Sequence, residues 1–310
     1  MASYIEELTV RAGRCPAVNF SSSGTLGDWQ AFHVPFLPPM PSSATGKIRV
    51  LVSASDDEVN ASDHQAVPVV IVGEISNMGF TAWVRNSDVS SGWSGLVWFA
   101  IAEQPEVLSN GSSQTPPLIR FGSTQPQHFQ YTGRRGDWRR WEIRHGTNAG
   151  FSGIPCSIVS PTNQNVRVHA SSAVGIVAGE TIDGFNLAAR SADVGPGACS
   201  FCYLSVLIGG GKASGKQMVD SGQVSPRNFS ATGLSGDWQV WSVAFAEPFL
   251  VPPVVLLTAD NANGTLNSYA RAAVGTAFDT TTNGFTLAAR NSDVMGGPAG
   301  FTWLAVGYAI

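Results

Sequence analysis

The segment GFTLAARNSD, residues 284–293, alternates between apolar and other side chains with a period of two. Phe285, Leu287 and Ala289 fall on one face of an extended chain, and the residues between them, up to Arg290, fall on the other. This pattern predicts a strand with one packed face and one freer face. Short segments rich in β-branched and aromatic residues recur at 97–103, 254–260 and 301–309, between turns rich in Gly and Pro. No stretch has a helical period, so the pattern predicts an antiparallel β-sandwich.

The same strand pattern occurs three times along the chain. GFTAWVRNSDV at 79–89 and GFNLAARSADV at 184–194 precede GFTLAARNSDV at 284–294, and each copy also has an upstream Gly-Asp-Trp. The second and third copies align without net insertion, whereas the first has four extra residues around PPMPSSATG. A repeat near 100 residues predicts three six-stranded sandwiches, each with its own core. We assign them to residues 1–106, 107–212 and 213–310, the second being the most divergent, with linkers at 103–117 and 209–227.

Charge and apolar content narrow the classes of partner. Charged residues are 13% of the chain and the formal net charge is −4, which provides no basic face for nucleic acid. No apolar run is long enough for a membrane helix, so membrane insertion is not expected. Glu6 and Glu7 stand where a signal peptide would be apolar. These observations predict a cytoplasmic protein or one exported by a non-classical route.

The cysteines and histidines predict no repeated reactive site. Cys199 and Cys202 form a C-x-x-C pair that is compatible with redox or metal chemistry, but they lie in an apolar strand-like stretch, where residues three apart face opposite sides. We therefore favour two thiols packed in the core. The five histidines do not recur at equivalent positions, and no catalytic motif repeats. We expect no enzyme activity, no metal and no cofactor.

Several motifs resemble the H-type lectins, the sandwich domain of snail agglutinins and of the C-terminal half of discoidins. They are Gly236 with Trp238, the run from Phe245 to Leu257, the Gly-Phe at 284–285 and the closing strand GFTWLAVG at 300–307. The third repeat matches over nearly its full length. The resemblance implies a carbohydrate-binding lectin for galactose or N-acetylgalactosamine-type glycans, with glycans or glycoproteins as partners.

The resemblance also implies sugar-site positions eight and nine residues after the Gly of the Gly-Phe, where the acid is kept and the family's stacking Trp is not. A family aspartate in the loop after the first Trp is also missing. An arginine on the preceding strand could be Arg271. Neighbouring arginine and asparagine side chains would supply further hydrogen-bond donors and acceptors to the sugar site of each repeat. The candidate residues are Arg85, Asn86, Asp88, Arg190, Asp193, Arg271, Arg290, Asn291 and Asp293.

The sequence is compatible with two interpretations of these residues. The acid can accept hydrogen bonds from sugar hydroxyls, or it can cap its own turn and pair with the arginine three residues earlier. The second reading leaves a structural or protein-interaction module that has lost the sugar site.

Two arrangements of the three repeats also remain open. H-type lectins assemble three sandwiches about a threefold axis, so the chain could close into an intrachain pseudo-trimer with multivalent binding. The alternative is a string of independent sandwiches.

Overall fold

A computed structural model shows an all-β chain. It describes residues 9–20, 30–44, 48–55, 68–86, 92–102, 119–129, 138–145, 151–162, 173–191, 197–207, 212–214, 217–229, 238–261, 273–291 and 297–308. The first repeat contains β1 (Thr9–Phe20), β2 (Gln30–Pro35), β3 (Ile48–Ser55), β4 (Pro68–Gly73), β5 (Gly79–Asn86) and β6 (Gly92–Ala102). The second contains β7 (Ile119–Ser123), β8 (Gln127–Phe129), β9 (Arg139–Arg144), β10 (Cys156–Thr162), β11 (Ala173–Thr181), β12 (Gly184–Ser191) and β13 (Gly197–Val206). The third contains β14 (Lys212–Ser214), β15 (Gln217–Phe229), β16 (Gln239–Ala244), β17 (Val254–Asn261), β18 (Ala273–Phe278), β19 (Gly284–Asn291) and β20 (Gly297–Tyr308).

The expected six strands are present in every repeat. In the second repeat the first strand is divided into β7 and β8, and in the third the short β14 is added ahead of it. The four extra residues of the first repeat lie in the β2–β3 connection, which includes a 3-10 turn at Ser42–Ala44. The described residues contain no α-helix, and hence no helix suited to crossing a membrane.

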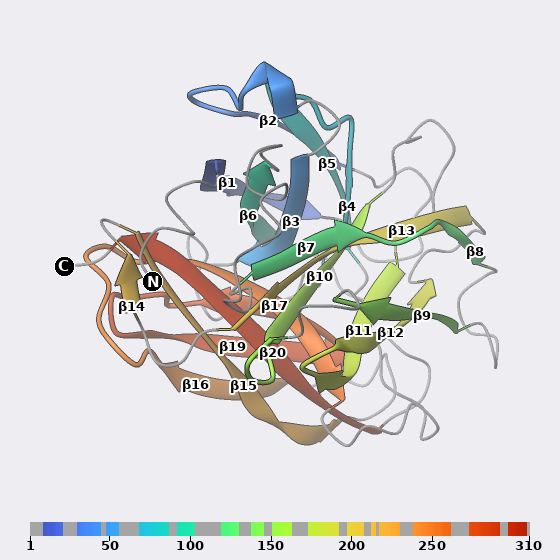
Figure 1. The fold of residues 1–310 in the computed structure, drawn as a ribbon. Coiled ribbons are helices and arrows are strands. Elements are labelled where there is room, and N and C mark those ends of the chain that lie inside the picture. The colour runs from blue at the N-terminus through green and yellow to red at the C-terminus, as the bar shows by residue number, and fades with distance from the viewer. Residues whose placement is uncertain are drawn as a thin grey trace.

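Each repeat folds as two antiparallel groups of three strands, and neighbouring repeats share their sheets. The first, sixth and third strands form one group, and the second, fifth and fourth form the other. The third strand of one repeat then pairs in parallel with the fourth strand of another: β3 with β18, β10 with β4, and β17 with β11. These three pairings form a cycle, so the repeats close into a ring with pseudo-threefold symmetry (Figure 1). The prediction of an intrachain pseudo-trimer is confirmed, and the string of separate sandwiches is excluded.

Four apolar clusters fill this ring. Three of them lie mainly within one repeat each. The fourth, which we call the central core, draws buried side chains from all three repeats, including the equivalent Leu51, Ile158 and Leu256. Burial of large apolar side chains between repeats is the main source of stability expected for such a ring. The expectation of apolar, packed surfaces between the repeats is therefore confirmed.

Three hydroxyl groups bind the repeats together beside the central core. The Ser160 side chain accepts a hydrogen bond from the Val52 N–H at 2.9 Å and donates to the Val52 carbonyl at 3.0 Å. Thr258 makes the same two contacts with Val159, and Ser53 makes them with Leu257. Val52 precedes the point where β3 begins to pair with β18, so the Ser160 hydroxyl from the second repeat replaces the missing sheet partner. We call Ser53, Ser160 and Thr258 the hydroxyl clamps.

The predicted linker at 209–227 is wrong over most of its length. Residues 217–227 belong to β15, which pairs with β20 along the edge of a sheet. The composition misleads because the strand contains Gly222, which lies under the Trp303 indole; a Cβ there would come within 2.8 Å of that ring. Gly13 lies under Trp98 in the same way. These glycines make room for an aromatic ring rather than for flexibility. The first predicted linker, 103–117, lies outside the described residues.

Two further details differ from the sequence prediction. β10 pairs with β13 through Cys156↔Val206, whereas β17 pairs with β20 through Val254↔Val306, so Cys156 rather than Ile154 corresponds to Val254. The β9–β10 connection is therefore two residues longer than the equivalent β16–β17 connection.

The second difference concerns the two faces of β19. Phe285, Leu287 and Ala289 do enter the core, but Ala288 on the supposedly freer face is also buried. Val240 lies opposite Ala288 on the neighbouring strand, and this larger side chain covers it.

The cysteine prediction is confirmed. Cys199 and Cys202 are free thiols with 1% and 2% exposure. Cys199 belongs to the core of the second repeat, while Cys202 faces the backbone of Val50 in the first repeat. Burial raises the pKa of the Cys199 thiol to about 12, so this thiol is held neutral.

Candidate functional site

The structure places the candidate arginines at one repeated position. Arg85, Arg190 and Arg290 pair with Val69, Val174 and Val274 on the adjacent strand. Asn86 and Asn291 end β5 and β19. Arg290 is buried, with 6% exposure, which limits its reach toward a ligand. Four predicted residues lie outside the described residues: Asp88, Asp193, Arg271 and Asp293. At these positions sugar contact and turn capping therefore both stay predictions.

The opposite end of each sandwich holds the turn between the fourth and fifth strands, and we call it the hairpin end. In each repeat a hydroxyl closes this turn by donating to a glycine carbonyl: Thr181 to Gly184 at 3.0 Å, Thr281 to Gly284 at 3.1 Å and Ser76 to Gly79 at 3.3 Å. Because this hydrogen bond occurs in all three turns, we assign it a structural role. The parallel pairing of β11 with β17 also brings the hairpin end of the second repeat to the boundary with the third.

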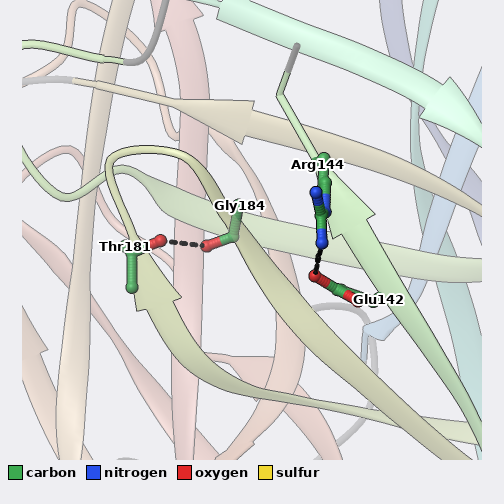
Figure 2. A network of polar contacts seen from close by, with 4 residues as sticks. All are labelled: Glu142, Arg144, Thr181 and Gly184. Carbon is green, nitrogen blue, oxygen red and sulfur yellow. Dashed lines mark hydrogen bonds and ion pairs between the residues drawn. The ribbon is translucent and has the colours of Figure 1, made fainter. Parts of the chain in front are cut away.

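A polar groove of about 520 Å³ opens at the hairpin end of the second repeat. Strands β9, β11 and β12 and the β11–β12 turn supply its lining: Glu142, Ile143, Arg144, Gly179, Thr181, Asp183, Gly184, Phe185 and Asn186. Figure 2 shows the Thr181–Gly184 contact in the turn and the Glu142–Arg144 pair on the neighbouring strand. We call this depression the groove.

The groove wall on β9 carries an exposed ion pair. Arg144 and Glu142 approach to 2.8 Å with their side chains 74% and 64% exposed, so the pair contributes little to stability. Both groups stay available to a ligand. Asn186 lies opposite Glu142 in the register of β12 and β9, and its amide can both donate and accept. A carboxylate, a guanidinium and an amide thus line one depression.

The groove floor is open because residue 179 is glycine. Gly179 has a φ of 62°, and a Cβ built on it would meet only the Asn186 amide nitrogen, at 3.4 Å. The equivalent residues are Glu74 and Asp279, with φ values of 52° and 49°. The left-handed backbone is therefore compatible with a side chain at this position in the other repeats. Glycine is present here for space as well as for backbone freedom.

A buried histidine lies behind the groove. The His145 N–H donates to the Asp183 carbonyl at 2.8 Å, and its ring packs against Phe151 and against Phe185 of the groove. The ring is 5% exposed, and among the described residues neither of its nitrogens has a hydrogen-bond partner. Burial lowers the pKa of His145, with a smaller lowering by the charge of Arg120 and an opposite effect of Asp183.

The equivalents of His145 are Phe36 and Phe245, whose N–H groups make the same contact with Met78 and Asn283. Sequence reasoning missed this position because histidines were compared only with one another. Aligning the residue that follows the second strand of each repeat would have found the Phe, His, Phe series.

Two carboxyl groups lie at the boundary beside the groove. Glu180 follows Gly179, and its Oε2 accepts a hydrogen bond from Gln223 of the third repeat at 2.9 Å. Asp260 lies within the parallel pairing of β17 with β11, opposite Val177, and is buried. Burial raises the pKa of Glu180 to about 7 and that of Asp260 to about 6. The other two boundaries have Thr280 with Ser55 and Ile75 with Thr162 at these positions.

Comparison of the chain with family models, with curated proteins and with solved structures gives no match. The resemblance to H-type lectins accordingly remains a prediction from the quoted motifs.

Proposed function

We propose that the chain is a carbohydrate-binding protein without catalytic activity, and that the groove of the second repeat holds the sugar. The groove carries the proposal because it places the exposed Glu142, Arg144 and Asn186 around one open space. Sugar hydroxyls both donate and accept hydrogen bonds, and this set offers the carboxylate, guanidinium and amide partners that they need. The motif resemblance independently favours galactose or N-acetylgalactosamine-type glycans.

The low charge of the chain supports the same class of ligand. Charged residues are 13% of the chain and the formal net charge is −4, a composition that favours neutral glycans over phosphate-bearing partners. The volume of about 520 Å³ falls within the usual range for small-molecule sites.

A glycan array followed by calorimetric titration of the best ligand tests the proposal. Glu142→Gln and Arg144→Gln each remove a charged hydrogen-bonding group and should weaken binding about 10- to 100-fold. Glu247→Gln changes an exposed carboxylate of the third repeat that lies outside the groove, and it should bind like the parent. Failure of every glycan to bind above background at high protein concentration would refute the proposal.

Exposed apolar side chains favour a second function, binding of a protein partner. Loops at the hairpin ends expose Leu37, Met78, Ile154, Ile182, Leu250 and Val251. Exposed apolar side chains at loop tips can contribute to an interaction surface where they form a contiguous patch. Under this alternative the chain is an interaction module whose sugar site has been lost, and a blank glycan array would favour it.

A further inference from the structure

The three repeats differ at the place where the groove lies. The positions that matter are the bulge before the turn, occupied by Glu74, Gly179 and Asp279, and the second-strand positions on the wall. Register pairs show which wall residues correspond: His33 with Thr81, Glu142 with Asn186, and Ser242 with Thr286. The bulge residue has a left-handed backbone in all three repeats, so its side chain and those of the wall decide what can bind.

In the first repeat, side chains bridge the equivalent space. The Thr81 hydroxyl donates to the Glu74 carboxylate at 2.8 Å, and the His33 Nδ1 lies 3.1 Å from the same hydroxyl. This chain of contacts runs from the bulge to the second strand, across the space that stays open above Gly179. A ligand would have to break these hydrogen bonds to enter.

In the third repeat, the wall is missing. Ser242 and Ala244 stand where the second repeat has Glu142 and Arg144, and Asp279 adds a side chain at the bulge. Short side chains cannot enclose a ligand or supply the carboxylate and guanidinium that the groove offers. The third repeat therefore lacks both the walls and the open floor.

We propose that the chain binds one ligand, in the second repeat alone, and that Gly179 together with the Glu142–Arg144 pair restricts binding to that repeat. This inference rests on the proposed function, because it specifies where and how many times the glycan binds. It differs from a site at Asp88, Asp193 and Asp293, which would be present three times in each chain.

Calorimetric titration with the best array ligand measures the stoichiometry directly. The parent chain should bind one ligand. Gly179→Asp copies the residue of the third repeat, and it should weaken binding at least 10-fold. The melting temperature should shift by less than about 4 °C, because Asp279 already adopts this backbone conformation. Asp279→Asn at the equivalent bulge is the matched control and should leave affinity and stoichiometry unchanged.

The reverse design installs the site where it is absent. Asp279→Gly, Ser242→Glu and Ala244→Arg combined in one variant should raise the stoichiometry from one ligand to two. A parent stoichiometry of three, or affinity unchanged by Gly179→Asp, would overturn the inference while leaving glycan binding intact. No binding by the parent would instead refute the proposed function.

Discussion

The centre of the ring and the groove of the second repeat differ in whether their side chains are repeated. At the centre the same chemistry occurs three times: the hydroxyl clamps Ser53, Ser160 and Thr258 make the same pair of backbone contacts around the ring. At the hairpin end the backbone and turn are repeated, but the side chains around the groove occur once. Equivalent positions of the three repeats can thus be compared within one chain.

That comparison separates structure from function within one sequence. A position that keeps its chemistry in all three repeats is one that the closed ring requires. At a position such as Gly179 the side chain differs between repeats while the backbone conformation is kept. The closed ring does not depend on the side chain at such a position. The boundary between the second and third repeats shows the same divergence, since Glu180 and Asp260 lie at positions that hold no carboxyl group at the other two boundaries.

The largest effect should come from the central core. Leu256 is fully buried at the junction of the three repeats, and Leu256→Ala should lower the free energy of unfolding by about 3 to 5 kcal/mol through lost contacts and a residual cavity. Leu250→Ala, at a side chain that is 58% exposed, should change it by less than about 0.5 kcal/mol. Urea unfolding measures both. Equal losses would mean that the centre does not hold the ring together.

The hydroxyl clamps should have the next largest effect. Ser160→Ala leaves the buried Val52 N–H and carbonyl without their partner, at a cost of about 2 to 3 kcal/mol. Ser160→Thr keeps the hydroxyl and matches Thr258 of the third repeat, so it should retain most of the stability. Hydrogen exchange at the Val52 amide reports the contact directly. An amide equally protected in the alanine variant would show that Ser160 is dispensable.

The sequence predicted the features that depend on pattern. The ring was predicted from the resemblance to H-type lectins. Alternation in the GFTLAARNSD segment and its two copies was sufficient for the strands and the three sandwiches. It failed at β15, where Gly222 and its polar neighbours resemble a linker. The composition of this strand carries little signal, because the aromatic ring that requires the glycine comes from Trp303, far along the chain.

The groove could not be predicted because its signal is a difference between copies. Gly179 is one of 34 glycines, and its meaning appears only when Glu74 and Asp279 are seen on the same backbone. Glu142 and Arg144, two residues apart on a strand, share a face by simple alternation. Sequence reasoning looked for repeated polar strings and so passed over side chains that occur once.

The boundary carboxyl groups should make stability depend on pH. The Asp260 carboxyl and the Cys156 thiol are the titratable groups that face Glu180, and Ser157 and Gln223 are its neutral hydrogen-bonding partners. The pKa of Glu180 rises from 4.5 to about 7 on folding, so the folded state holds a proton that the unfolded chain has released. Stability is therefore highest below about pH 4.5 for this group and falls until about pH 7.

Glu180→Gln tests this dependence, because the variant cannot ionise and keeps a similar shape. It should be more stable than the parent by about 2 kcal/mol at pH 8 and nearly equal to it at pH 4. Glu142→Gln, at an exposed carboxyl, is the matched control and should show no such pH-dependent difference. A difference that is the same at both pH values would show that burial of the charge is not the cause.

The smallest effect, and one of opposite sign, is expected at His145. Its pKa lies below the ordinary 6.5 because the ring is buried among Phe151 and Phe185, so the folded state resists protonation. For this group stability is fully present above about pH 6.5 and is lost as the pH falls below it. His145→Phe copies Phe36 and Phe245 and should stabilise the chain at pH 5, with a smaller gain at pH 8. Thermal melts at the two pH values measure the difference. His128→Phe, at an exposed histidine of the second repeat, serves as the control for adding an aromatic ring without removing a buried base. A gain at His145 that is larger at pH 8 than at pH 5 would contradict the assignment of a buried neutral imidazole behind the groove.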